Sequence, residues 1–250
     1  MSGRIRTQKK LPTVLYIHGG GWIFGDRTGA VPELLPYLQK GWNVVNVEYR
    51  MASQSLAPAA VEDSRCALRW VYHNADKFHF DTDRIIVTGH SAGGHLALMT
   101  GMLTADAGFD NNCPAEPFFG EKPLKVAAIV NWYGITDVVD LLDGKNRRTY
   151  AIEWLGSQPN RLALAKQLSP LTYAVVGAPP VITIHGDADP TVPYSQALAL
   201  KDALTKAHIA NEFIIVLGGK HGFQAFTDAQ TLDAYAKIFA FLSANVAGLK

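Results

Sequence analysis

The stretch that most constrains this chain is residues 85–98, which has the pattern of a strand, a sharp turn and a helix. An apolar, β-branched run ends at Gly89, and apolar residues at helical spacing begin just past Gly93. Between them lies Gly-His-Ser-Ala-Gly, centred on Ser91. A serine at the tip of such a turn has a strained backbone and needs room on both sides, which the two glycines give. The pattern therefore predicts a strand–turn–helix unit that exposes the Ser91 hydroxyl.

The Gly-x-Ser-x-Gly spacing in this setting is typical of a serine nucleophile. The helix that follows would point its positive N-terminal end at an oxyanion formed on Ser91, and the backbone N–H of Ala92 is expected to donate to it. The alternative is a glycine-rich turn between a strand and a helix, without chemistry. The rest of the chain decides between the two.

A second glycine-rich segment, His-Gly-Gly-Gly-Trp at residues 18–22, follows the first apolar run. Three consecutive glycines free the backbone to aim N–H groups into a cleft. A phosphate-binding Gly-x-Gly-x-x-Gly loop would need glycine where Phe24 stands, and no Gly-Lys-Ser/Thr follows. We therefore predict that Gly20 and Gly21 complete an oxyanion hole, with a plain glycine turn as the alternative. His18 is expected to fix this loop and not to act as a base.

Two later strands end in an acid and a histidine. One apolar run precedes His-Gly-Asp-Ala-Asp at residues 185–189, and another precedes Gly-Gly-Lys-His, which ends at His221. Asp189 stands before Pro190, which disfavours an α conformation and stiffens the position of the carboxylate. Asp187 lies in the tight turn, where an aspartate commonly caps backbone N–H groups. The pattern predicts Asp189 and His221 as the acid and the base that serve Ser91.

Six apolar runs alternate with helical patterns, which predicts an α/β fold with a mostly parallel, doubly wound sheet of about six strands flanked by helices. The polar residues above follow strand ends, where such sheets place their ligand sites. A chain of 250 residues that is 48% hydrophobic suits one domain, residues 1–250, in which about 135–173 form a small lid or wall. The expected strands are 12–17, 43–48, 85–89, 126–131, 180–184 and 213–217.

Composition excludes several classes of function. The formal net charge of +1 gives no reason to expect a nucleic-acid or membrane partner, and no apolar run reaches transmembrane length. The histidines show no His-x-x-x-His pair, so neither a metal nor a cofactor is expected. Cys66 and Cys113 have no metal or redox spacing and are predicted to be free thiols of a cytoplasmic protein. Residues 1–10 lack a signal-peptide core, and a secreted location is the alternative if the N-terminus is truncated.

These motifs, in the order Ser…Asp…His, resemble those of the α/β-hydrolase carboxylesterases of the hormone-sensitive-lipase-related group, over about residues 12–245. The segments at residues 25–27, 91–96 and 185–190 are similar to the small feruloyl/acetyl-xylan esterase-like branch. The group usually has two strands, and in larger members a cap, before the His-Gly-Gly-Gly strand. Both are expected to be absent here. The strand at 43–48 then becomes a sheet edge that invites pairing with a second chain, so a homodimer is one expectation.

The resemblance implies hydrolysis of small-molecule esters, of short-chain or aryl (feruloyl/acetyl) type, through an acyl-enzyme. Trp22, His90 and Trp132 are the expected substrate contacts. Flat aromatic faces for an acyl ring are also sought in Phe118, Phe119 and Trp154. Three alternatives stay open: an amidase of the same fold such as a kynurenine formamidase, a peptidase of the prolyl-oligopeptidase type, and a catalytically inactive binding module.

Overall fold

The centre of the molecule is one sheet of six strands, ordered β2-β1-β3-β4-β5-β6, in which every neighbouring pair is parallel. The computed structural model describes residues 9–110, 112–113 and 124–249. The predicted α/β fold with a doubly wound parallel sheet is confirmed, and β2 lies at the sheet edge as expected. The strands are β1 Leu11–Ile17, β2 Asn43–Val47, β3 Phe80–His90, β4 Ala128–Trp132, β5 Val181–Gly186 and β6 Asn211–Val216.

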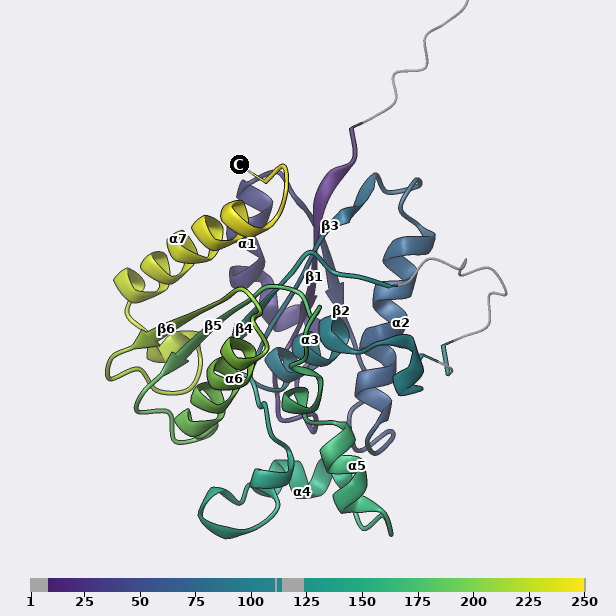
Figure 1. Cartoon of the computed structure of the whole chain (residues 1–250), viewed down its shortest axis with the longest axis vertical. Coiled ribbons are helices and arrows are strands. Elements are labelled where there is room, and N and C mark those ends of the chain that lie inside the picture. The colour runs from purple at the N-terminus through teal and green to yellow at the C-terminus, as the bar shows by residue number, and fades with distance from the viewer. Residues whose placement is uncertain (1–8, 111, 114–123, 250) are drawn as a thin grey trace, which may run out of the picture.

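Helices cover both faces of the sheet (Figure 1). α1 (Val31–Gln39) and α7 (Asp228–Asn245) lie on one face, and α2 (Ala59–His73), α3 (Ala92–Met102) and α6 (Tyr194–Lys206) lie on the other. Strands buried on both faces need apolar residues at nearly every position, which is why their sequences do not alternate. All strands of the sheet therefore end along the same edge of the molecule.

α3 is the central helix, and its sequence is apolar on every side because every side is covered. Its first turn packs too closely for side chains. A Cβ atom on Gly93 would lie 2.0 Å from the Ile17 carbonyl oxygen, and one on Gly94 would lie 2.7 Å from Asn131 Oδ1. These glycines let α3 begin directly against the ends of β1 and β4. That contact fixes the position of the turn that carries Ser91.

The segment predicted as a lid or wall is helical and packs onto the body of the protein. It contains α4 (Thr149–Leu155) and α5 (Arg161–Gln167), which lie beyond the strand ends (Figure 1). Trp154 stacks on Trp22 with 4.1 Å between ring centroids, and both side chains are fully buried. The segment therefore shares the main core.

The prediction of two free thiols is wrong. Cys66 in α2 and Cys113 form a disulfide, with 5.3 Å between their Cα atoms. Beside it, the buried Arg65 guanidinium donates to both carboxylate oxygens of Asp110 at 2.7 and 2.6 Å and to the Thr100 carbonyl at 2.8 Å. The disulfide and the ion pair together tie the segment after α3 to α2. Because disulfides persist in oxidising compartments, the argument for a cytoplasmic location loses its basis.

The described residues contain neither a membrane-spanning helix nor a cluster of metal-binding side chains. No helix there combines the length and the apolarity that crossing a bilayer requires. In the same part of the chain, no group of three or more His, Cys, Asp or Glu side chains is arranged to hold a metal ion.

Candidate active site

Ser91 stands at the turn between β3 and α3 with φ 57° and ψ −123°, a conformation that few residues other than glycine adopt. Its backbone N–H donates to the Trp132 carbonyl at 2.9 Å, which ties the turn to β4. A Cβ atom on Gly89 would lie 2.4 Å from the Gly93 carbonyl oxygen, so the motif glycine is required here. Sequence and structure agree on a strained turn that presents the serine at the edge of the sheet.

Ser91, His221 and Asp189 form a continuous chain of hydrogen bonds. His221, in the loop after β6, has Nε2 2.9 Å from Ser91 Oγ and Nδ1 2.7 Å from Asp189 Oδ2. A carboxylate can only accept, so Nδ1 donates to Asp189, and Nε2 is then the acceptor for the Ser91 hydroxyl. The sequence placed these residues after three different strands, and the structure brings all three together.

The Asp189 carboxylate is buried and held in one orientation. Burial by itself raises its pKa, but the hydrogen bond and charge of His221 and the backbone donors outweigh burial, so the pKa lies below its ordinary value. Oδ1 accepts from the backbone N–H groups of Thr191 at 2.7 Å and Val192 at 3.0 Å. His185 Nε2 lies 3.5 Å from Oδ2 and donates to the Val192 carbonyl at 3.0 Å. Asp189 is therefore ionised and already oriented toward His221.

The neighbouring carboxylate, Asp187, points elsewhere. Its Oδ1 accepts from the Gly218 N–H at 2.7 Å, in the turn that follows β6. Asp187 was expected to cap its own tight turn, and it caps the adjacent one instead. Only Asp189 reaches His221.

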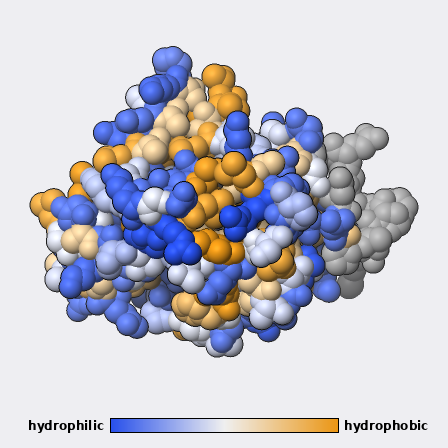
Figure 2. All heavy atoms as spheres, turned by 90° about the horizontal axis from the view of Figure 1, so that it is seen from below, coloured by the Kyte–Doolittle hydropathy of each residue, from blue (hydrophilic) through white to orange (hydrophobic). Residues whose placement is uncertain are grey.

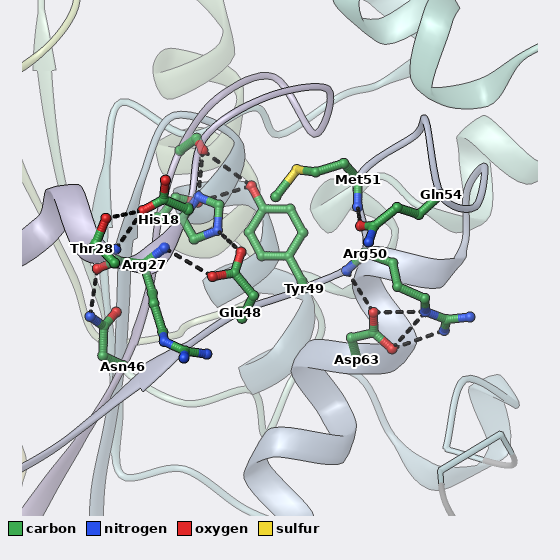
Figure 3. A network of polar contacts seen from close by, with 12 residues as sticks. His18, Arg27, Thr28, Asn46, Glu48, Tyr49, Arg50, Met51, Gln54 and Asp63 are labelled. Atoms are coloured by element: carbon green, nitrogen blue, oxygen red, sulfur yellow. Dashed lines mark hydrogen bonds and ion pairs between the residues drawn. The ribbon is translucent and has the colours of Figure 1, made fainter.

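His18 and Tyr49 hold the glycine-rich loop after β1 in place by hydrogen bonds to its carbonyl groups (Figure 3). His18 Nδ1 donates to the Gly19 carbonyl at 2.8 Å, and the Tyr49 hydroxyl lies 3.1 and 3.2 Å from the carbonyls of His18 and Gly19. The His18 ring stacks on Tyr49, and its Nε2 lies 3.2 Å from Glu48 Oε1. His18 therefore has the loop-fixing position that was predicted for it.

The three predicted oxyanion donors are unused. Within the described residues, no hydrogen bond takes the N–H of Gly20, Gly21 or Ala92. Ala92 is the first residue of α3, and a first helical N–H has no partner inside its helix. Gly20 and Gly21 have φ 116° and 59°, so the loop turns in a way that favours glycine. The site therefore offers free backbone donors next to Ser91 and in the loop packed against its turn.

The expected contacts of Trp22 and Trp132 with a substrate are wrong in this structure. Trp22 is 0% exposed and Trp132 is 1% exposed. Trp22 packs between Trp154 and His95, and Trp132 lies against Phe223 at 4.6 Å between ring centroids. Trp154 is buried too, and Phe118 and Phe119 lie outside the described residues. A strand-end tryptophan looks the same in sequence whether its ring turns inward or outward.

His90, the third expected contact, also has partners inside the protein. Its Nδ1 lies 2.8 Å from the Tyr16 hydroxyl, and its Nε2 accepts from the Gly19 N–H at 3.2 Å. One side of the ring borders a cavity of about 340 Å³ that the glycine loop shares with Asp26 and Glu33. His90 therefore contacts the glycine loop directly, and a substrate is not needed to explain its position.

Two tyrosines near the site carry no motif and could not be found from the sequence. A Cβ atom on Gly21 would lie 2.9 Å from Tyr150 Cβ, so α4 closes over the glycine loop. Tyr133 packs edge-on against the His221 ring with 4.9 Å between centroids. Figure 2 looks onto this end of the molecule, where apolar atoms gather near the middle of a largely hydrophilic face.

Comparison with known proteins gives consistent matches. The BD-FAE family model matches residues 4–204. Esterase LipQ of Mycobacterium tuberculosis is 30% identical over 231 residues, covering 90% of this chain and 52% of that protein. Esterase LipC of the same organism is 27% identical over 250 residues, covering 94% and 59%. The chain thus spans about half the length of the curated relatives it matches.

Solved structures match over nearly the whole chain. Esterase 2 of Thermogutta terrifontis, solved with propionate bound, gives a TM-score of 0.78 at 25% identity and covers 97% of this chain and 86% of that one. A truncated carbohydrate esterase from gut microbiota gives 0.77 at 25% identity, with coverage of 94% and 87%.

Proposed function

The chain belongs to the BD-FAE family and has an α/β-hydrolase fold, and from this premise we propose that it is a serine carboxylesterase acting through an acyl-enzyme. One observation carries the proposal. Asp189 Oδ2, His221 and Ser91 Oγ are joined by hydrogen bonds of 2.7 and 2.9 Å at the carboxyl edge of a parallel sheet. That arrangement is what a serine nucleophile with a general base and an orienting acid requires.

In the acylation step, Ser91 Oγ attacks the ester carbonyl while His221 Nε2 takes its proton. Asp189 holds the imidazole in the required tautomer and stabilises the imidazolium. The oxyanion of the tetrahedral intermediate accepts hydrogen bonds from the N–H groups of Gly20, Gly21 and Ala92. Each such donor stabilises the transition state by roughly 3 kcal/mol. His221 then gives the proton to the leaving alcohol oxygen.

In the deacylation step, a water molecule takes the place of the alcohol. His221 removes a proton from that water, whose oxygen attacks the acyl carbonyl, and the same donors receive the second oxyanion. The proton passes to Ser91 Oγ as the acid leaves. Every step uses side chains and backbone groups of this chain, so the proposal requires no metal or cofactor.

The proposed substrates are esters of short acyl groups on a small alcohol. The propionate bound in Thermogutta terrifontis esterase 2 supports a short acyl group. A preference for aryl acyl groups such as feruloyl now rests on the family resemblance alone, because the tryptophans expected to stack on a ring are buried. A feruloyl ester therefore serves as the comparison substrate.

The experiment is a labelling assay joined to a substrate panel. A fluorophosphonate probe should modify wild-type protein at Ser91, located by peptide mass spectrometry, and should not modify Ser91→Ala. The p-nitrophenyl esters of C2–C4 acids should turn over faster than C12, with methyl ferulate, acetylated xylan and N-formylkynurenine as further substrates. Faster turnover of C12 contradicts the short-acyl proposal, preference for N-formylkynurenine supports an amidase, and an unlabelled native protein supports a binding module.

We propose that the protein works in an oxidising compartment of the cell or outside it. The Cys66–Cys113 disulfide supports this, since such bonds are rare in cytosolic proteins. Titration of thiols in unfolded protein purified without reductant tests it. Two free thiols per chain in material from the native host would contradict it.

A further inference from the structure

The hydrogen bonds of His90 define which of its nitrogens carries the proton. The Gly19 N–H can only donate, so His90 Nε2, 3.2 Å away, must hold the lone pair. In a neutral ring the proton then sits on Nδ1, which donates to the Tyr16 oxygen at 2.8 Å. The neutral His90 ring next to Ser91 is therefore the Nδ1–H tautomer.

Together with His18 and Tyr49, His90 Nε2 holds two consecutive peptide groups of the glycine loop by hydrogen bonds. The peptide that links His18 to Gly19 is held at its oxygen by Tyr49 and at its N–H by His90. The next peptide is held at its oxygen by Tyr49 and His18, which leaves the Gly20 N–H free. Because each peptide is planar and trans, the Gly20 N–H points away from the side where His18 and Tyr49 lie. Losing His90 releases one end of this arrangement.

The His90 ring also fills the space between the glycine loop and the loop that carries His221. A Cβ atom on Gly19 would lie 2.7 Å from both Cδ2 and Nε2 of the ring, so the loop lies flat against it. The ring also meets Phe223 edge-on, with 5.7 Å between centroids. His90 thus touches both loops that flank Ser91.

The charge environment keeps His90 uncharged. Burial, and to a smaller extent the electrostatic interaction with His18 and His221, lowers the pKa of His90 to about 4. Its other titratable neighbours are Tyr16, bonded to Nδ1, Tyr133, whose ring centroid lies 6.2 Å away, and the carboxylates of Asp26 and Glu33, which line the adjoining cavity. A second proton would go on Nε2. The Nε2–H would then face the Gly19 N–H, and two donors would oppose each other.

We propose that His90 is a positioning residue: as the neutral Nδ1–H tautomer, it holds the Gly19 N–H and thereby aims the free N–H groups of the glycine loop at the oxyanion. The proposal deepens the esterase function proposed above and rests on it. It replaces the expectation that His90 contacts the substrate.

A matched pair of variants tests it. In His90→Gln the side chain still carries an acceptor oxygen at about the reach of Nε2, whereas His90→Asn extends only to the position of Nδ1. With a short p-nitrophenyl ester, His90→Asn should lower kcat by about tenfold to a hundredfold while KM stays within about twofold, because the transition state alone uses the oxyanion donors. His90→Gln should recover most of kcat. Equal losses in the two variants, or a loss confined to KM, would overturn the proposal.

A second measurement needs no activity. Nitrogen-15 NMR of the wild-type imidazole should show the proton of His90 on Nδ1 and a bare Nε2 at every pH from 8 down to about 5. Tyr16→Phe, which removes the partner of Nδ1, should leave Nε2 bare, because the Gly19 N–H still needs an acceptor. A proton on Nε2, or a charged ring at pH 6, overturns the inference even if esters are hydrolysed. Absence of ester turnover in the wild type overturns the proposed function instead.

Discussion

At the scale of single residues, Asp187 and Asp189 make a sharp test because they stand two apart in one loop. Asp189→Asn removes the acceptor that fixes the His221 tautomer, so kcat should fall on the order of 10⁴-fold, the figure known for the same change in a serine protease. The fold should persist, because the amide oxygen can still accept from Thr191 and Val192. Steady-state kinetics with a circular dichroism control measure this.

Asp187→Asn is the matched control, with the same chemical change in the same loop. It weakens only the cap on the Gly218 N–H, so activity should fall roughly tenfold or less, through loop stability alone. An inactive Asp187 variant beside an active Asp189 variant would reverse the two roles.

His95 makes a prediction about stability and pH. It is fully buried, donates from Nε2 to the Leu168 carbonyl at 2.7 Å, and has its pKa lowered by burial to about 4. Between the ordinary histidine pKa of about 6.5 and pH 4, His95 binds a proton in the unfolded chain but stays neutral in the folded chain. The free energy of unfolding should therefore fall by about 3 kcal/mol from His95 alone as pH drops through this range, and stay level above it.

Urea unfolding at a series of pH values measures that slope. His95→Gln keeps a donor for Leu168 but has nothing to titrate, so its stability should change less between pH 7 and 4 than that of the wild type. The test lies in the difference of slopes, because the substitution also shifts absolute stability. Parallel curves would contradict the assignment.

At the scale of elements, the disulfide stabilises the junction between α2 and the segment after α3. It closes a loop of 47 residues, and a cross-link of that length contributes about 4 kcal/mol by restricting the unfolded chain, with measured values nearer 2–4. The double variant Cys66→Ala, Cys113→Ala should lose that much unfolding free energy in urea. Ester hydrolysis should persist, because the Arg65–Asp110 pair still holds the segment. A variant as stable as the wild type would contradict this.

The edge strand β2 leads to a prediction about the oligomeric state of the protein. Its backbone pairs with β1 on one side only, since no further strand follows it in the sheet among the described residues. An apolar edge of this kind favours pairing with a second copy. Sedimentation velocity should show a homodimer that Val45→Lys weakens, while a single monomer species at all loading concentrations contradicts it.

At the scale of the whole molecule, much of the fold could be predicted because local patterns determine it. Apolar runs long enough for a strand identified all six strands to within a few residues, except that β3 begins earlier, at Phe80. The site followed from the same logic. Once the strands are parallel, the residues after β3, β5 and β6 must meet at one edge, and the motifs at those points name Ser91, Asp189 and His221.

What could not be predicted depends on distance in space and on the direction of side chains. Cys66 and Cys113 carry no spacing that marks a pair, and their proximity appears only once α2 packs beside the segment after α3. Trp22 is buried and its backbone adopts φ 62°, neither of which the triple glycine before it reveals. His90 has no partner within its own motif, since both of its hydrogen bonds reach residues on β1 or just after it.

The 130 residues that separate Ser91 from His221 have a consequence for how the chain becomes active. A nascent chain that has formed β1 to β4 has the strands that hold its nucleophile in the strained turn, yet has no base to take the proton. Reactivity must wait until the last strand has been synthesised and has docked at the far side of the sheet. Turnover is therefore a reporter of completed folding, and during refolding it should return later than the secondary structure of the N-terminal half.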